Sequence, residues 1–258
     1  MKKFKFLIAI FPLLVLLGCS VKEKRDGCPC RLFLDMTSLD MVDQSPFELH
    51  VLSDDGFEYK AVLDVENCKD TCVVDVPRTG LDVMVWSGGS SFMDENGLTI
   101  PFGRDCPPVY IYSARLEADG ESIYDVVKLR KNYCLLSISI EQPDAVTSLT
   151  VRGGVSGFDK LGKPSGGEFS VFSDVAHKSY PSISFCLPRQ NEAPIYLDVT
   201  ESDGRIRTFP LHDYIAEFGY DWSKPDLNDL NMILNFTPVG VTITIKSWEE
   251  ELIIDVVI

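Results

Sequence analysis

The sequence predicts an all-β protein, with two tandem β-sandwich domains that follow an N-terminal signal peptide. Short apolar or alternating segments recur along the chain, separated by Asp-Gly and Asn-Gly pairs that suit tight hairpin turns. No sustained helical periodicity appears after residue 18. Many short strands at this spacing are typical of β-sandwiches, and 258 residues leave room for two domains.

The first 18 residues have the features of a secretory signal peptide. Three lysines lie within the first five residues, and an apolar run of twelve residues, from Leu7 to Gly18, follows them. A membrane-spanning helix needs roughly 20 apolar residues, and Pro12 interrupts this shorter run further. A basic segment followed by a short apolar segment is instead typical of a cleaved leader.

The end of this leader, Leu16-Leu17-Gly18-Cys19, resembles a bacterial lipobox, in which a small residue precedes a lipidated cysteine. We therefore expect cleavage between Gly18 and Cys19, and a diacylglycerol with further acylation on Cys19. Two or more acyl chains hold a protein stably at a membrane, whereas a single chain gives marginal binding. Residues 19–26 then form a charged tether, and Ser20 favours the outer membrane. The alternative is a secreted protein with a chance cysteine at its cleavage point.

Segments with strand character fill most of the remaining chain. The expected strands are 31–35, 47–52, 58–65, 72–76 and 81–86 in the first half, and 133–141, 148–153, 181–187, 194–199, 205–211, 229–236, 241–247 and 251–258 in the second. A short helix is expected at 212–218, and the glycine-rich stretch 153–169 is expected to be a long connection. The basic segment 127–132 predicts the seam between an N-terminal domain at 27–130 and a C-terminal domain at 131–258.

The charge of the chain argues against two classes of partner. The formal net charge is −15, and it becomes −18 without the predicted leader, which has three lysines and no acidic residue. So acidic a surface repels phosphate backbones, and we expect no nucleic-acid partner. It equally disfavours electrostatic attachment to anionic lipids, which leaves the acyl anchor as the membrane contact.

No motif predicts catalysis, a metal site or a cofactor. The chain has no H-E-x-x-H motif and no G-x-S-x-G nucleophile elbow, because Phe158 stands two residues after Ser156. The histidines His50, His177 and His212 are scattered, and the cysteine pairs lack the spacing of structural zinc sites. We therefore predict a protein that is not an enzyme, with no cofactor and no small-molecule substrate.

The chain ends on an apolar, β-branched segment with no polar tail. Such a segment is an aggregation hazard unless it is paired. Pairing within its own domain is the favoured expectation, and strand addition to a neighbouring subunit is the alternative. The candidate strand-exchange segment consists of Glu251, Leu252, Ile253, Ile254, Asp255, Val256, Val257 and Ile258.

Several motifs in a consistent order resemble the anchor-type minor fimbrillins, which are lipoproteins of the fimbriae of Bacteroidia. These motifs are Arg25–Leu32 with its Cys-Pro-Cys, Val83–Gly89, Asp105–Tyr110, Lys128–Asn132, Leu149–Gly153, Arg189-Gln190, Tyr214-Ile215, Gly219–Trp222 and Ser247-Trp248. The resemblance implies two transthyretin-like β-sandwich domains on a lipid anchor at the outer membrane, facing the cell surface. It also implies a role in tethering, capping or limiting a fimbrial fibre through contacts with other fimbrial subunits.

The resemblance further places Cys28, Cys30 and Cys106 in family-like motifs of the N-terminal domain, which suggests a disulfide between Cys106 and Cys28 or Cys30. Seven cysteines remain when Cys19 is set aside, so at least one has no partner within the chain.

The alternative function is that of a surface lipoprotein that binds a glycan or host ligand without any fibre. Trp86, Trp222 and Trp248 would stack on sugar rings in that case. An exposed row of these three rings favours this hypothesis, and burial of all three removes its support.

Overall fold

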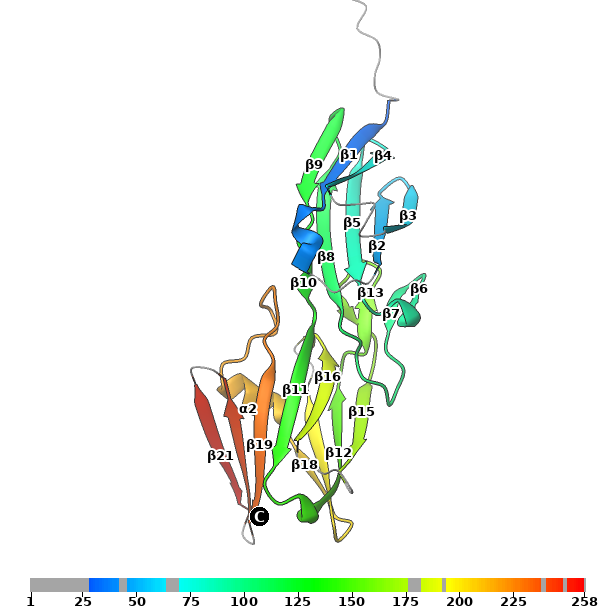
Figure 1. Ribbon diagram of the computed structural model, residues 1–258. Coiled ribbons are helices and arrows are strands. Elements are labelled where there is room, and N and C mark those ends of the chain that lie inside the picture. The colour runs from blue at the N-terminus through cyan, green and yellow to red at the C-terminus, as the bar shows by residue number, and fades with distance from the viewer. Residues whose placement is uncertain are drawn as a thin grey trace, which may run out of the picture.

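The computed structural model describes residues 28–41, 46–63, 70–175, 182–191, 194–237, 240–247 and 250–257. The predicted signal peptide, its predicted cleavage point after Gly18 and the predicted lipidation site Cys19 lie outside these residues. The described chain consists almost entirely of strands in stacked sheets, which confirms the all-β sandwich prediction (Figure 1). The molecule is elongated, and its first described strand lies at one end while the strands of the C-terminal half lie at the other.

The N-terminal half is a sandwich of a three-stranded sheet, in the order β4-β1-β9, and a five-stranded sheet, in the order β10-β8-β5-β2-β3. Its elements are β1 (Cys30–Asp35), η1 (Thr37–Met41), β2 (Phe47–Ser53), β3 (Glu58–Leu63), β4 (Thr71–Val76), β5 (Gly80–Ser87), β8 (Tyr110–Glu117), β9 (Ser122–Val126) and β10 (Arg130–Lys131). Because side chains alternate across a strand, one face of each sheet is buried. Leu32 and Leu34 of β1 share a core with Leu49 of β2 and Val83 of β5.

The C-terminal half is a second sandwich, with sheets in the orders β16-β11-β19-β20-β21 and β15-β12-β17-β18. Its elements are β11 (Tyr133–Ile140), η3 (Pro143–Ala145), β12 (Val146–Gly153), β15 (Phe169–Asp174), β16 (Ser182–Pro188), β17 (Tyr196–Glu201), β18 (Ile206–Phe209), α2 (Leu211–Glu217), β19 (Leu230–Thr237), β20 (Gly240–Lys246) and β21 (Glu251–Val257). Ile138 and Met232 of one sheet share a core with Leu149 and Leu197 of the other. The helix predicted at 212–218 is thus confirmed as α2.

A small sheet combines strands from both halves, in the order β14-β13-β7-β6. Its elements are β6 (Met93–Asp94), β7 (Gly97–Thr99), β13 (Gly157–Asp159) and β14 (Pro164–Ser165), and η2 (Ser90–Phe92) precedes it. Gly157 pairs with Thr99, and a Cβ atom on Gly157 would lie only 1.9 Å from the carbonyl oxygen of Leu98. The expectation of a plain connection at 153–169 is therefore wrong: this stretch contains β13 and β14, which join the two halves.

The core clusters follow this division only in part. The larger cluster contains the C-terminal core together with Met84, Trp86 and Ile111, which lie on the outward face of the N-terminal five-stranded sheet. The shared sheet covers that face, since Leu98 of β7 and Phe158 of β13 belong to the same cluster. The two halves are therefore joined through a buried apolar junction.

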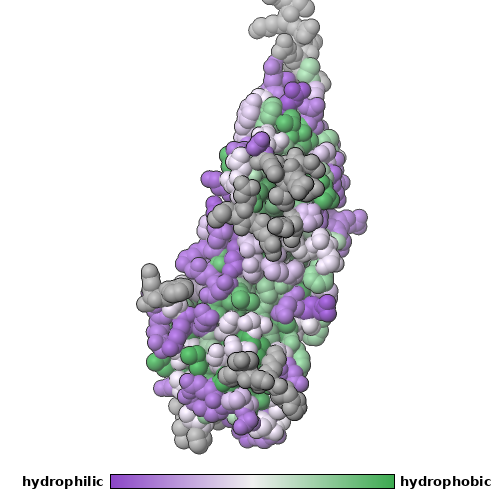
Figure 2. All heavy atoms as spheres, in the orientation of Figure 1, coloured by the Kyte–Doolittle hydropathy of each residue, from purple (hydrophilic) through white to green (hydrophobic). Residues whose placement is uncertain are grey.

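On the outer face of the molecule that Figure 2 draws, hydrophobic residues form separate patches among hydrophilic ones.

Candidate functional site

The first described strand lies in the middle of its sheet. β1 pairs antiparallel with β4 and parallel with β9, so that Leu32 lies between Val74 and Ile123. Cys30, Leu32 and Leu34 are completely buried. Since Cys30 follows Cys19 by only eleven positions, the strand nearest to the predicted lipid attachment point is an integral part of the N-terminal core.

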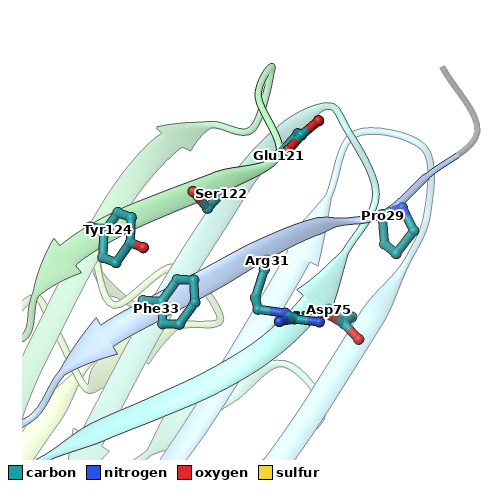
Figure 3. A pocket seen from close by; sticks show the side chains of 7 residues that line it. All are labelled: Pro29, Arg31, Phe33, Asp75, Glu121, Ser122 and Tyr124. Atoms are coloured by element: carbon teal, nitrogen blue, oxygen red, sulfur yellow. Dashed lines mark hydrogen bonds and ion pairs between the residues drawn. The ribbon is translucent and has the colours of Figure 1, made fainter. Parts of the chain in front are cut away.

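The opposite face of the same three strands carries an exposed aromatic pair. Phe33 of β1 and Tyr124 of β9 stack with ring centroids 4.6 Å apart and an interplanar angle of 8°. Figure 3 shows the two rings side by side on neighbouring strands. Tyr124 is 71% exposed, and Val73, opposite Phe33 on β4, is 48% exposed. Apolar side chains therefore form a row across this outer face.

Two shallow hollows flank the aromatic pair, and both are lined by Phe33 and Tyr124. The first has a volume of about 370 Å³ and is also lined by Pro29, Arg31, Asp75, Glu121 and Ser122 (Figure 3). The second has a volume of about 380 Å³ and is also lined by Asp35, Thr71, Asp125 and Val126.

Charged groups at these hollows are held by local hydrogen bonds. Arg31 Nε donates to Asp75 Oδ1 at 3.3 Å. The hydroxyl and the backbone N–H of Thr37 donate to Asp35 Oδ1 at 2.7 and 2.9 Å, and these two bonds lower the pKa of the Asp35 carboxyl. Aromatic rings beside fixed charges and hydroxyls suit a ligand that has both apolar and polar faces.

The C-terminal segment forms β21, the last strand of its sheet. β21 pairs with β20 from Glu251 opposite Lys246 to Val257 opposite Gly240. Ile254 packs against the core, whereas Ile253 is 60% exposed. The segment is therefore paired within its own domain. Its other edge is the end of the sheet as far as the described residues show, and exchange of this strand with a neighbour stays a prediction.

Arg189 forms a polar junction that the sequence analysis did not identify as functional. Its half-buried guanidinium donates to Asn132 Oδ1 at 2.7 Å, and burial lowers its pKa. It also donates to four backbone carbonyls, those of Lys131, Trp222, Lys224 and Pro225. Arg189 therefore connects the end of β16 to the β10–β11 junction and to the loop before β19. Only the Arg189-Gln190 motif pointed to this position.

The cysteines suggested as disulfide partners lie in different places. Cys28, Cys30 and Cys106 are free thiols. Cys30 belongs to the core of the N-terminal sandwich, whereas Cys106 belongs to the larger cluster and lies beside Cys186. The structure forms no bridge between Cys106 and either of the other two cysteines.

The tryptophans do not form an exposed row in the described part of the chain. Trp86 is buried, with its ring edge-on to Phe158, and Trp222 is half-buried beside Tyr220. Trp248 lies outside the described residues.

The described residues contain neither a metal-binding cluster nor a membrane-spanning helix. No group of three or more His, Cys, Asp or Glu side chains there could hold a metal ion. None of the helices in this part of the chain has the length and apolar character to cross a membrane.

Comparison with known proteins gives matches in structure alone. No protein-family model and no curated protein matches the chain. The fimbrial anchor protein Mfa2 from Porphyromonas gingivalis matches with a TM-score of 0.62 and 12% identity, over 86% of this chain and 98% of Mfa2. A candidate adhesin from Bacteroides ovatus matches with a TM-score of 0.62 and 8% identity, over 88% of this chain and 96% of that one.

A third similar structure is that of a candidate polysaccharide-binding protein from Bacteroides thetaiotaomicron. It matches with a TM-score of 0.59 and 13% identity, over 88% of this chain and 98% of that one. These three proteins are named for fimbrial, adhesive or binding roles rather than for an enzymatic activity. The chain therefore shares its fold with a fimbrial anchor protein, a candidate adhesin and a candidate polysaccharide-binding protein of Bacteroidia, in agreement with the resemblance described above.

Proposed function

We propose that this protein is an outer-membrane lipoprotein and a minor fimbrial subunit that anchors or caps a fimbrial fibre at the cell surface. The observation that carries the proposal is the position of β1. The strand begins eleven residues after Cys19, lies between β4 and β9, and buries three side chains completely. A lipid on Cys19 is thereby connected through a short tether to the centre of a folded domain. The fold shared with a fimbrial anchor protein supports this role.

The contact with the next subunit is proposed at β21. This strand belongs to the half of the molecule farther from β1 (Figure 1). An incoming strand would bond to main-chain groups along its open edge, and exposed side chains such as Ile253 would set the register. We also propose the domain boundary at residues 130 and 131, between the N-terminal domain 27–130 and the C-terminal domain 131–258.

Replacing Cys19 with Ala should move the protein, and any fibre attached to it, from the membrane fraction into the medium. The physical reason is that the proposed acyl chains are its stable contact with the membrane. Fractionation with immunoblotting measures the protein, and electron microscopy of cells and medium measures the fibres. Cys28→Ala is the matched control, because Cys28 is exposed and lies outside the lipobox.

The two parts of the proposal fail separately in this experiment. If the Cys19→Ala protein stays in the membrane fraction, the lipid anchor is wrong. If the protein is released but fibres stay on the cell at normal length, the anchoring role is wrong.

A second candidate function is glycan binding at the outer face of β1. The stacked rings of Phe33 and Tyr124, flanked by Arg31, Asp75 and Ser122, favour it, and a candidate polysaccharide-binding protein has the same fold. Tyr124→Ala should weaken binding of a recognised glycan about 5-fold, since an aromatic contact contributes roughly 1 kcal/mol. The unfolding midpoint should change little because the ring is exposed.

A glycan array followed by titration calorimetry measures this effect. Phe172→Ala is the control, because Phe172 is an exposed aromatic residue on β15, away from this face. Equal affinities of the wild type and both variants would exclude the outer face of β1 as the glycan site.

A further inference from the structure

Cys106 and Cys186 come from different halves of the chain and lie side by side. Cys106 belongs to the connection between β7 and β8, which crosses onto the C-terminal half. Within this connection, Ile100 N donates to Ser156 O and Gly103 N donates to Ser170 O, both at 2.8 Å. Cys186 lies on β16. The segment that precedes Cys106 is therefore hydrogen-bonded to residues of the C-terminal half.

The two cysteines contact each other through both their backbones and their side chains. Cys106 N donates to Cys186 O at 3.0 Å, and Cys186 N donates to Asp105 Oδ1 at 3.0 Å. The two thiols are also hydrogen-bonded to each other, so the two sulfur atoms lie in contact. Sulfur atoms that are already in contact are placed to form a bridge between these two residues.

The two thiols differ in their access to solvent. Cys106 is buried, and burial followed by its hydrogen bond to the Cys186 thiol raises its pKa well above the usual range. Cys186 is partly exposed. An oxidant in solution therefore reaches Cys186 first, and Cys106 stands next to it to complete the reaction.

We propose that Cys106 and Cys186 form a disulfide that joins the two halves when the protein meets an oxidising thiol–disulfide pool. The Cys186 thiolate attacks a small-molecule or protein disulfide and releases one thiol. The Cys106 sulfur then attacks the mixed disulfide and releases the second thiol. The two cysteines lose two protons and two electrons, and the oxidant is reduced to two thiols. This bond does not depend on a fimbrial role.

The test uses the full-length protein, purified in detergent without reductant and treated with oxidised glutathione. After alkylation and digestion with trypsin, mass spectrometry should find peptide 105–115 joined to peptide 179–189, each of which contains one cysteine. The joined species should disappear on reduction. Because the bond closes a loop between positions 80 residues apart, the unfolding midpoint should be about 10 °C higher without dithiothreitol than with it.

Two variants complete the test. Cys186→Ser should abolish the joined peptides and make the midpoint insensitive to dithiothreitol, whereas Cys28→Ser should behave as the wild type. If Cys186→Ser does not fold, the wild-type comparison with and without reductant decides alone. Recovery of Cys106 and Cys186 as separately alkylated residues, or joined to other cysteines, would overturn the proposal.

Discussion

Replacing Leu32 with Ala should lower the free energy of unfolding by about 2–5 kcal/mol. Leu32 is completely buried in β1, the central strand of its sheet, and its side chain faces the five-stranded sheet across the N-terminal core. Truncation removes apolar contacts and leaves a cavity. Because β1 is hydrogen-bonded to β4 on one side and to β9 on the other, its backbone cannot move to fill that cavity. Urea unfolding of the wild type and the variant measures the difference. The free energy of unfolding of a typical domain is roughly 5–15 kcal/mol, so a loss of this size is a large share of it.

Leu135→Ala is the matched control, since it makes the same chemical change in a strand at a side chain that is 38% exposed. We expect it to lower the free energy of unfolding by about 1 kcal/mol or less. Equal losses in the two variants would mean that β1 is not part of the cooperatively folded core, and the proposed connection from Cys19 to the fold would lose its basis.

Replacing Arg189 with Ala should destabilise the protein by about 3 kcal/mol. The change removes the donor for four backbone carbonyls and for Asn132 Oδ1. A buried acceptor without a partner costs about 1–3 kcal/mol, and water that reaches the half-buried junction offsets part of the total. Thermal and urea unfolding measure the loss. Because this junction connects the end of β16 to the β10–β11 segment, we also expect increased proteolysis near residues 128–132.

Two further variants separate geometry from charge at this position. Arg189→Lys keeps the positive charge but loses the planar fork of donors, so its stability should lie between those of the wild type and Arg189→Ala. Arg205→Ala is the control, because Arg205 is exposed and its ion pair is with Asp203, at 3.6 Å. It should change stability by about 0.5 kcal/mol or less. If Arg189→Ala lowered the free energy of unfolding by no more than Arg205→Ala does, this result would contradict the structural role of Arg189.

The strands that the sequence predicted are those whose pattern is local. In β2, Phe47, Leu49 and Val51 are buried and the residues between them are half-buried, so alternation alone identifies the strand. β9 was missed because its pattern misleads: Tyr124 and Val126 are exposed, while Asp125 is half-buried. β8 was missed as well. Its exposed Arg115 forms an ion pair with Asp82 of β5 at 3.1 Å, and no local sequence pattern indicates such a partner.

The candidate sites depend on contacts between distant segments. The aromatic pair joins Phe33 to Tyr124 through a parallel pairing of β1 and β9, and a local sequence pattern does not reveal the register of such a pairing. Cys106 and Cys186 are likewise brought together by a contact between segments that are far apart in the sequence. The suggested bridge from Cys106 to Cys28 or Cys30 relied on the order of motifs along the chain, whereas the structure brings Cys106 to β16 of the other half. β13 and β14 were missed because β13 pairs with the distant β7 and β14 pairs with β13, and the glycines of this stretch also resemble those of a loop.

The central position of β1 determines how the molecule resists mechanical pulling. Hydrogen bonds between strands lie across the strand direction. A force that pulls β1 along its length from its N-terminal end therefore loads all of its backbone hydrogen bonds to β4 and β9 in shear at the same time. When an edge strand is instead pulled sideways from its single neighbour, its backbone hydrogen bonds break one after another, at lower force. With six residues paired to β4 and five to β9, β1 should rupture only at high force, and single-molecule stretching from residue 28 should show one late, abrupt event.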